Sequence, residues 1–339
     1  MTIAKWISPI AAISIAAAAI STAGAVFAQE QDPRPELSPL ERVPAARAKA
    51  AAEKTEDDRV FGGQQADKDE WPFQVALLNS NVLDDSVESQ GNGQFCGGSL
   101  IAPDWVLTAA HCMVQNGAKI APESVTVLSG ATDLREGSRN KAVEIFVHES
   151  YDQNNLDNDI ALIHLAAPVT DGKVIKLIDA DRNDGDATVI GWGMTDDGSF
   201  PYALMETDIA LYPNEKCNAG IRDIYARDLT KILTQLSGRM RYPAEVVMDA
   251  TQVIASRMTD PLTGNMLCAG DPTGARDACN GDSGGPLFST AGGEPVQVGI
   301  VSWGEGPFDA GAACGHANAY GIYTRLANYT GWIAEKMGQ

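Results

Sequence analysis

The chain has 339 residues, 44% of them hydrophobic, so it can bury a large core and form either one large domain or two smaller ones. Its formal net charge at pH 7 is −20, and residues 1–59 account for only −1 of it, with seven Lys/Arg and eight Asp/Glu. A surface this acidic argues against nucleic acid as a partner and favours solubility.

The first 28 residues predict a cleavable secretory signal peptide. Lys5 supplies an early positive charge, residues 10–20 form an apolar run, and Ala28 ends a stretch suited to signal peptidase cleavage. The run is short and rich in Ala, Ser and Thr for a spanning helix of about 20 apolar residues, which favours cleavage over an uncleaved anchor. We therefore expect a secreted protein, periplasmic or extracellular, of bacterial type, with no stable membrane association after signal cleavage.

Residues 29–59 have the composition of a disordered pro-segment. They contain four prolines and alternating charge, with almost no aromatic or β-branched residues. Such a segment cannot bury enough surface to offset the entropy of ordering. It ends at Arg59, after an acidic run, and Val60 would begin the mature domain at residues 60–339.

From Val60 onward the pattern indicates an all-β domain, because short β-branched or aromatic runs alternate with Gly, Asn and Asp clusters. Residues 218–267 differ, since apolar residues recur there at helical spacing up to Gly238 and again before Asp260. This predicts a helical hairpin, which either packs on its own domain or offers a surface to a partner. A short C-terminal helix is expected over residues 326–337. The clearest runs of strand type are residues 124–128, 142–147, 160–165, 187–190 and 296–303.

Three separated motifs carry the chemistry. Residues 277–286 surround Ser283 with glycines, residues 108–112 contain His111, and residues 157–162 contain Asp159. A serine hydroxyl is a poor nucleophile at neutral pH, so it needs a histidine base and a carboxylate that orients the base. The order His, Asp, Ser is that of the chymotrypsin arrangement. Asp157, two residues before Asp159, is the rival acid.

On these motifs the chain resembles a trypsin-like serine protease of the chymotrypsin family, from Val60 to the C-terminus. The resemblance implies two six-stranded antiparallel β-barrels, at about residues 60–175 and 185–325, with the substrate cleft between them and a C-terminal helix. The stretch 218–267 is a departure, some three dozen residues longer than the usual loop. Further matching segments are Trp71-Pro72-Phe73-Gln74-Val75, Cys96-Gly97-Gly98-Ser99-Leu100, Gly191-Trp192-Gly193, Ser302-Trp303-Gly304 and Gly321-Ile322-Tyr323-Thr324-Arg325.

The resemblance also implies a role for each site residue. Ser283 would be the nucleophile, His111 the general base and acid, and Asp159 the residue that fixes the histidine tautomer. The backbone N–H groups of Gly281 and Ser283 would form the oxyanion hole. The Asp-Ile-Ala-Leu match favours Asp159 over Asp157.

Activation and specificity follow from further matches to the family. Cleavage after Arg59, by this enzyme or by a separate activating protease, would free the Val60 amine to pair with Asp282. Asp277 would lie at the base of the substrate pocket and select a cationic side chain before the scissile bond. Four further residues are assigned to that pocket: Ala278, Ser302, Gly304 and Gly321.

Among cationic residues we expect Arg to be preferred over Lys. Ala278 lacks a hydroxyl that would help to solvate a lysine ammonium, whereas a guanidinium can pair bidentately with Asp277. The expected partners are therefore protein or peptide substrates with Arg or Lys before the scissile bond.

Six cysteines in an exported chain predict three disulfides, although the spacing alone allows fifteen pairings. A zinc site is the alternative, but paired Cys-x-x-Cys spacing is lacking, and nothing in the sequence indicates a required cofactor. The resemblance narrows the pairings to one set: Cys96 with Cys112, Cys217 with Cys268, and Cys279 with Cys314.

Two other functional interpretations remain open. A relative that has lost its activity could serve as a binding module, although the intact motifs argue against this. Alternatively, the insertion at residues 218–267 could make the enzyme a narrow processing protease in place of one that degrades proteins broadly.

Overall fold

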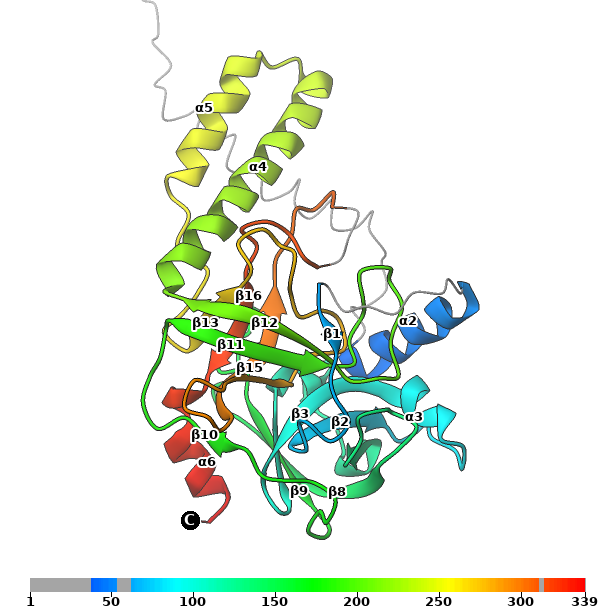
Figure 1. Ribbon diagram of the computed structural model, residues 1–339. Helices are drawn as coiled ribbons and strands as arrows, with labels where there is room; N and C mark the ends of the chain where they lie inside the picture. Colours follow the sequence, from blue (N-terminus) through cyan, green and yellow to red (C-terminus); the bar gives the residue numbers. More distant parts are fainter. Residues whose placement is uncertain (1–37, 54–61, 311–313, 339) are drawn as a thin grey trace, which may run out of the picture. The chain divides into compact units, whose positions relative to one another are not determined.

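The computed structural model describes residues 38–53, 62–310 and 314–338. Two β-barrels and several helices make up this part of the chain (Figure 1). The expected signal peptide and the cleavage junction at Arg59 and Val60 lie outside the described residues.

Six antiparallel strands close the first barrel in the order β2-β3-β4-β9-β8-β7. Strand β2 is buried along its whole length. Its Val, Ala and Leu side chains pack both inside the barrel and against its outer surface. The strands are β2 (Gln74–Asn79), β3 (Gln94–Ala102), β4 (Trp105–Thr108), β7 (Val125–Ser129), β8 (Ser138–Val147) and β9 (Ala161–Leu165).

The second barrel is the ring β12-β11-β14-β15-β16-β13, which closes where β13 pairs back with β12. Buried and more exposed side chains alternate along β12, as expected for a strand with one face toward the core. The predicted all-β fold of two six-stranded barrels is thus confirmed. The strands are β11 (Gly185–Gly191), β12 (Met205–Tyr212), β13 (Met266–Gly270), β14 (Pro286–Ser289), β15 (Val296–Gly304) and β16 (Gly321–Arg325).

Shorter elements flank the barrels. The predicted C-terminal helix is confirmed, as a 3-10 turn, η3, followed by α6, whose Ile333 is buried. Strand β1 pairs with β12, β10 pairs with β15, and β5 pairs with β6. The bounds are β1 (Gln64–Gln65), β5 (Val114–Gln115), β6 (Ala118–Lys119), β10 (Lys176–Leu177), α3 (Glu88–Gly93), α6 (Thr330–Lys336), η1 (Ala110–Cys112), η2 (Pro122–Ser124) and η3 (Leu326–Asn328).

The predicted helical hairpin is confirmed and consists of α4 (Asn214–Met240) and α5 (Ala244–Ala255), which lie side by side (Figure 1). Helix α4 begins earlier than its apolar spacing indicates, before Cys217, whose disulfide to Cys268 ties the helix to β13. In α4 the buried residues lie between Cys217 and Ile224, near its start, and in α5 Val247 is buried.

One expectation was wrong: residues 39–53 of the pro-segment form a helix, α2 (Pro39–Glu53). The segment is rich in alanine and other good helix formers. Its few apolar side chains, Leu40 and Val43, are buried in the main core, where they are 4% and 2% exposed. The composition suggested disorder because the segment alone has no surface against which its apolar side chains can be buried. In the structure the barrels provide that surface.

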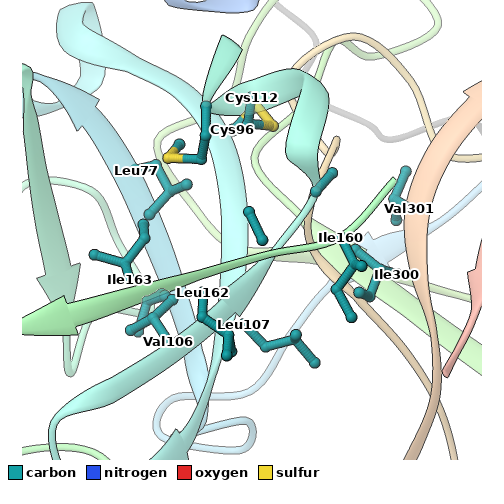
Figure 2. Close-up of a cluster of buried hydrophobic side chains, with 14 of the residues drawn as sticks. Leu77, Cys96, Val106, Leu107, Cys112, Ile160, Leu162, Ile163, Ile300 and Val301 are labelled. Carbon is teal, nitrogen blue, oxygen red and sulfur yellow. A yellow bond between two sulfur atoms is a disulfide. The ribbon is translucent and has the colours of Figure 1, made fainter. Parts of the chain in front are cut away.

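The main hydrophobic core runs continuously through both barrels. Figure 2 shows Ile160, which follows the first barrel's Asp159, next to Ile300 and Val301 of β15. The two barrels are therefore packed against each other close to the expected catalytic residues.

The three disulfides pair Cys96 with Cys112, Cys217 with Cys268, and Cys279 with Cys314. This is the set that the resemblance implies. Within the described residues, no helix combines the length and the apolar character needed to cross a bilayer.

Candidate active site

His111 lies on η1, the turn that follows β4 of the first barrel. The disulfide between Cys96 and Cys112 links this turn to β3. Thr108 reinforces the link, because its hydroxyl donates to the Gly97 carbonyl at 2.8 Å. The histidine is thus held on a rigid turn, with its side chain 13% exposed.

Asp159 accepts hydrogen bonds that orient the histidine. One carboxylate oxygen accepts from the His111 backbone N–H at 2.8 Å, and the other lies 2.7 Å from His111 Nδ1. The Ser302 hydroxyl donates to this second oxygen at 2.5 Å, and Thr324 Oγ1 donates to the Asp159 carbonyl at 2.6 Å. A carboxylate at Nδ1 keeps the proton on that nitrogen in the neutral ring, which leaves Nε2 as the proton acceptor.

Asp157 has different partners and does not compete with Asp159 for the histidine. Its carboxylate accepts from Thr263 Oγ1 at 2.6 Å and from Asn265 Nδ2 at 3.2 Å. These contacts tie the loop before β9 to the segment before β13, which is a structural role.

Ser283 lies where the second barrel meets β3 of the first. Its carbonyl accepts from the Gly97 N–H at 2.8 Å, and the following Gly284 donates to Val301 at 2.8 Å. Gly284 has a φ of +80°, and any Cβ there would collide with Thr108 Oγ1. The glycines after the serine are therefore required by the turn and by the close approach of the first barrel.

Gly281 adopts a φ of +104°, a conformation that side chains disfavour. A Cβ at this position would lie 3.1 Å from the Cα of Gly193. The Gly281 carbonyl accepts from Gln94 Nε2 at 2.9 Å, which fixes the peptide plane on one side of the segment expected to form the oxyanion hole.

Asp282 is buried, with its side chain bonded to backbone groups. Its two carboxylate oxygens accept from the N–H groups of Gly193 at 2.7 Å and Cys279 at 2.9 Å. A Cβ on Gly191 or Gly193 would collide with this carboxylate, which explains the Gly-Trp-Gly segment. Burial raises the pKa of Asp282 to about 6, because the ionised form is poorly solvated.

Asp277 is the residue expected at the base of the substrate pocket. Its carboxylate accepts from the Gly315 N–H at 3.1 Å, and a Cβ on Gly321 would lie 3.3 Å from it. Around Gly304 the space is open within 4 Å. Burial raises the pKa of Asp277 to about 7, against the lowering effect of hydrogen bonds from Gly315 and Ala278.

Ser302 and Ala278 complete the set assigned to the pocket. Ala278 precedes Cys279, whose disulfide to Cys314 joins the two segments that carry Asp277 and Gly315. The Ser302 side chain is bonded to Asp159, so only its backbone remains to contact a substrate. The structure thus adds a contact to the triad that the sequence reasoning did not foresee.

Two more residues near the site were missed. Gln94, at the start of β3, bonds the Gly281 carbonyl, and the buried Arg47 of α2 bonds Gln94. The position of Gln94, two residues before Cys96, is a signal that could have been used. Arg47 could not have been found from local sequence, because its partners lie 47 and 145 residues away.

Among the described residues, one cluster has the geometry to hold a metal ion: Cys96, His111 and Cys112. The two sulfurs are joined in a disulfide and the imidazole is hydrogen-bonded to Asp159, so this donor set does not fit a metal.

A family model described as Trypsin matches residues 60–333. The chain is 35% identical to the vitamin K-dependent protein C of Mus musculus over 296 residues, 84% of this chain and 53% of that protein. It is 33% identical to the Rattus norvegicus protein of the same name over 294 residues, 83% of this chain and 52% of that protein. The chain therefore spans about half the length of these relatives.

Proposed function

Because this chain belongs to the trypsin family of serine endopeptidases, we propose that it is an exported zymogen that is activated by cleavage after Arg59. The active enzyme then hydrolyses peptide bonds after Arg, and less readily after Lys, through an acyl-enzyme. The observation that carries this proposal is the buried contact between Asp159 and His111, at 2.7 Å, on the turn that faces the Ser283 segment.

The proposed chemistry begins with Ser283. Its hydroxyl attacks the scissile carbonyl while His111 Nε2 takes the proton, and the imidazolium then returns that proton to the leaving amine. Asp159 stabilises the imidazolium, and the hydroxyl of Ser302 in turn supports the carboxylate. Water attacks the acyl-enzyme in the same way and releases the acid product.

The backbone N–H groups of Gly281 and Ser283 stabilise the oxyanion in this scheme. The loss of one such donor typically lowers turnover about 100- to 1,000-fold. The hydrogen bond from Gln94 to the Gly281 carbonyl supports this role, because it fixes the orientation of the glycine.

Asp277 selects the substrate. Burial raises the pKa of Asp277 to about 7, because the ionised carboxylate is poorly solvated. A cation that enters the pocket offsets this penalty by pairing with the carboxylate. A guanidinium can engage it bidentately, while Ala278 offers no hydroxyl to a shorter ammonium.

Activation requires a new partner for Asp282. Cleavage after Arg59 frees the Val60 amine, which then pairs with the buried Asp282 carboxylate and orders the oxyanion segment. Breaking a buried ion pair commonly costs about 3–5 kcal/mol, so the uncut chain favours an incompetent state. An Arg59→Gln variant should therefore remain an inert precursor, and full activity in that variant would contradict the scheme.

Export is supported by the signal-like N-terminus and by the three disulfides, which form and persist in oxidising compartments. The bacterial source that the N-terminal segments suggest stays a prediction, since both relatives reported above are mammalian.

The specificity is tested by replacing Asp277 with Ser. Hydrolysis of an arginyl peptide should fall about 30-fold or more in kcat/KM, because truncating one partner of a buried charge pair costs about 2–5 kcal/mol. A fluorophosphonate probe should still label Ser283 at the wild-type rate. Unchanged hydrolysis after Arg would remove Asp277 from the pocket, and loss of labelling would point to a general disruption of the site.

A further inference from the structure

Helix α2 of the pro-segment is docked on the protease domain through one face. Leu40, Val43 and Arg47 follow one another at helical spacing and are 4%, 2% and 6% exposed. Arg42, on the same helix, is exposed. A buried arginine in a segment that is to be cut away requires a specific partner on the domain.

A proline inside α2 creates one of the docking contacts. Pro44 has no N–H, so the Leu40 carbonyl four residues earlier loses its normal helical donor. Asn79, at the end of β2, supplies the missing donor, with its Nδ2 3.0 Å from that carbonyl. A side chain of the first barrel therefore satisfies a backbone carbonyl that the helix itself leaves without a donor.

The guanidinium of Arg47 enters the domain beside the oxyanion segment. It donates to the Trp192 carbonyl at 2.5 Å and to Gln94 Oε1, and it lies over the Phe200 ring, 4.7 Å from the centroid. Burial lowers the pKa of Arg47 to about 9, and the carboxylate of Asp282 acts in the opposite direction.

These contacts reach the proposed oxyanion hole. Gln94 accepts from Arg47 through its side-chain oxygen and donates to the Gly281 carbonyl through its nitrogen, at 2.9 Å. A Cβ built on Gly281 would lie 3.6 Å from Val43 Cγ1. Helix α2 therefore touches the segment that must be correctly placed for catalysis.

We propose that the surface formed by Asn79, Gln94 and Trp192 is an inhibitory binding site for an arginine-bearing helix, and that α2 is its occupant. Arg47 supplies the cation near Asp282 in the uncut chain, and the Val60 amine displaces it after cleavage. The inference rests on the activation scheme proposed above.

Competition between the two cations follows from the burial of Asp282. One carboxylate can neutralise one cation, so a second positive group nearby would be buried without compensation. The pro-segment contains no cysteine, so after cleavage only these non-covalent contacts retain it. Activation thus has two steps, cleavage after Arg59 and release of α2.

Release can be measured without catalysis. In the full chain, Thr55→Asp, Glu56→Asp and Arg59→Lys create an enteropeptidase site before Val60, and Ser283→Ala prevents self-digestion. After complete cleavage, gel filtration with mass spectrometry follows the fragment that carries α2. We expect it to leave the domain slowly in the unaltered chain, at least tenfold faster with Arg47→Gln, and at the unaltered rate with the matched control Arg42→Gln.

Immediate loss of the fragment from the unaltered chain, or equal retention with Arg47→Gln, overturns the proposal. If Arg47→Gln does not fold, Val43→Ala takes its place, because it removes two methyl groups that are buried against the domain and should also speed release. Equal retention with Val43→Ala counts against the proposal in the same way.

The inhibitory effect is measured with Ser283 intact. Activity should lag behind cleavage in the unaltered chain and should follow cleavage without a lag in Arg47→Gln. Full activity while the fragment is still bound would show that the site does not inhibit. Fragment release as expected, with no activity in any variant, would instead contradict the proposed protease function and leave the binding site standing.

Discussion

Ser302 combines a contact with Asp159 and a place on β15 next to residues assigned to the substrate pocket. Its hydroxyl donates to the same Asp159 oxygen that lies beside His111 Nδ1. The resemblance assigned Ser302 to substrate binding alone, because this contact between the two barrels is not visible in the sequence.

Ser302→Ala should lower kcat by about tenfold and leave KM for an arginyl peptide nearly unchanged. A hydrogen bond to a charged group contributes about 1.5–3 kcal/mol, and about 1.4 kcal/mol corresponds to tenfold in rate. Steady-state kinetics of the activated enzyme measure this, with Ser302→Thr as the control that keeps a hydroxyl. A variant whose KM rises while kcat holds would assign Ser302 to the substrate instead.

Asp277 makes cation binding depend on pH near neutrality. Since burial raises its pKa to about 7 in the free enzyme, most of the carboxyl is protonated at pH 6 and ionised at pH 8. The inhibition constant of benzamidine, a small amidinium, should rise about tenfold as the pH falls from 8 to 6. Asp277→Asn should remove most of this change, and a constant value across that range would contradict the raised pKa.

The same carboxyl should destabilise the fold at higher pH. A pKa raised above the ordinary value of about 3.9 means that stability is highest below that value and is lost as the pH rises through about 7. Asp277→Asn should therefore raise the melting temperature at pH 8 more than at pH 4. Equal effects at both pH values would show that ionisation is not the cause.

At the scale of elements, α4 supports the loop that follows Gly304. Tyr225 donates to Glu305 at 2.6 Å, Asp228 accepts from the Phe308 N–H at 3.1 Å, and Lys231 lies 2.6 Å from Asp309. Because this loop follows Gly304, which is assigned to the substrate pocket, we expect the hairpin to influence access to the candidate site.

Tyr225→Phe should raise KM for an extended arginyl peptide about 3- to 10-fold, with kcat unchanged. The variant removes one hydrogen bond to a carboxylate, worth about 1.5–3 kcal/mol, of which we expect only a part to affect substrate binding through the loosened loop. Tyr242→Phe, at the exposed outer end of the hairpin, is the matched control and should have no effect. Equal KM values for both variants and the unaltered enzyme would limit the hairpin to a structural role.

The elements also show how far the sequence can predict this protein. The hairpin followed from its apolar spacing and the strands from runs of β-branched and aromatic residues, whereas the two barrels and the C-terminal helix came from the resemblance in motifs. Helix α2 did not, since Leu40, Val43 and Arg47 are too few to predict burial and depend on Asn79 and Gln94 of the first barrel. The triad residues were identifiable from motifs, whereas the support of Asp159 by Ser302 needed the packing of two barrels.

At the scale of the whole molecule, the site exists only where the two barrels meet. The Gly97 N–H bonds the Ser283 carbonyl at 2.8 Å, and Ser99 Oγ bonds Gln297 Oε1 at 2.6 Å across the same boundary. Thr324 of the second barrel donates to the Asp159 carbonyl. Contacts between the barrels therefore hold the candidate catalytic residues, and Arg47 of α2 bonds Gln94 of the first barrel and Trp192, which follows β11 of the second.

The central claim is that cleavage before Val60 turns an inactive precursor into an arginine-specific serine endopeptidase. The most direct measurement treats the purified chain with a trace of trypsin, sequences the new N-terminus, and assays matched fluorogenic peptides that end in Arg, Lys, Phe and Ala. We predict that hydrolysis after Arg appears together with a Val60 terminus, with weaker hydrolysis after Lys. A homogeneous Val60 terminus without activity on any of the four peptides would contradict it.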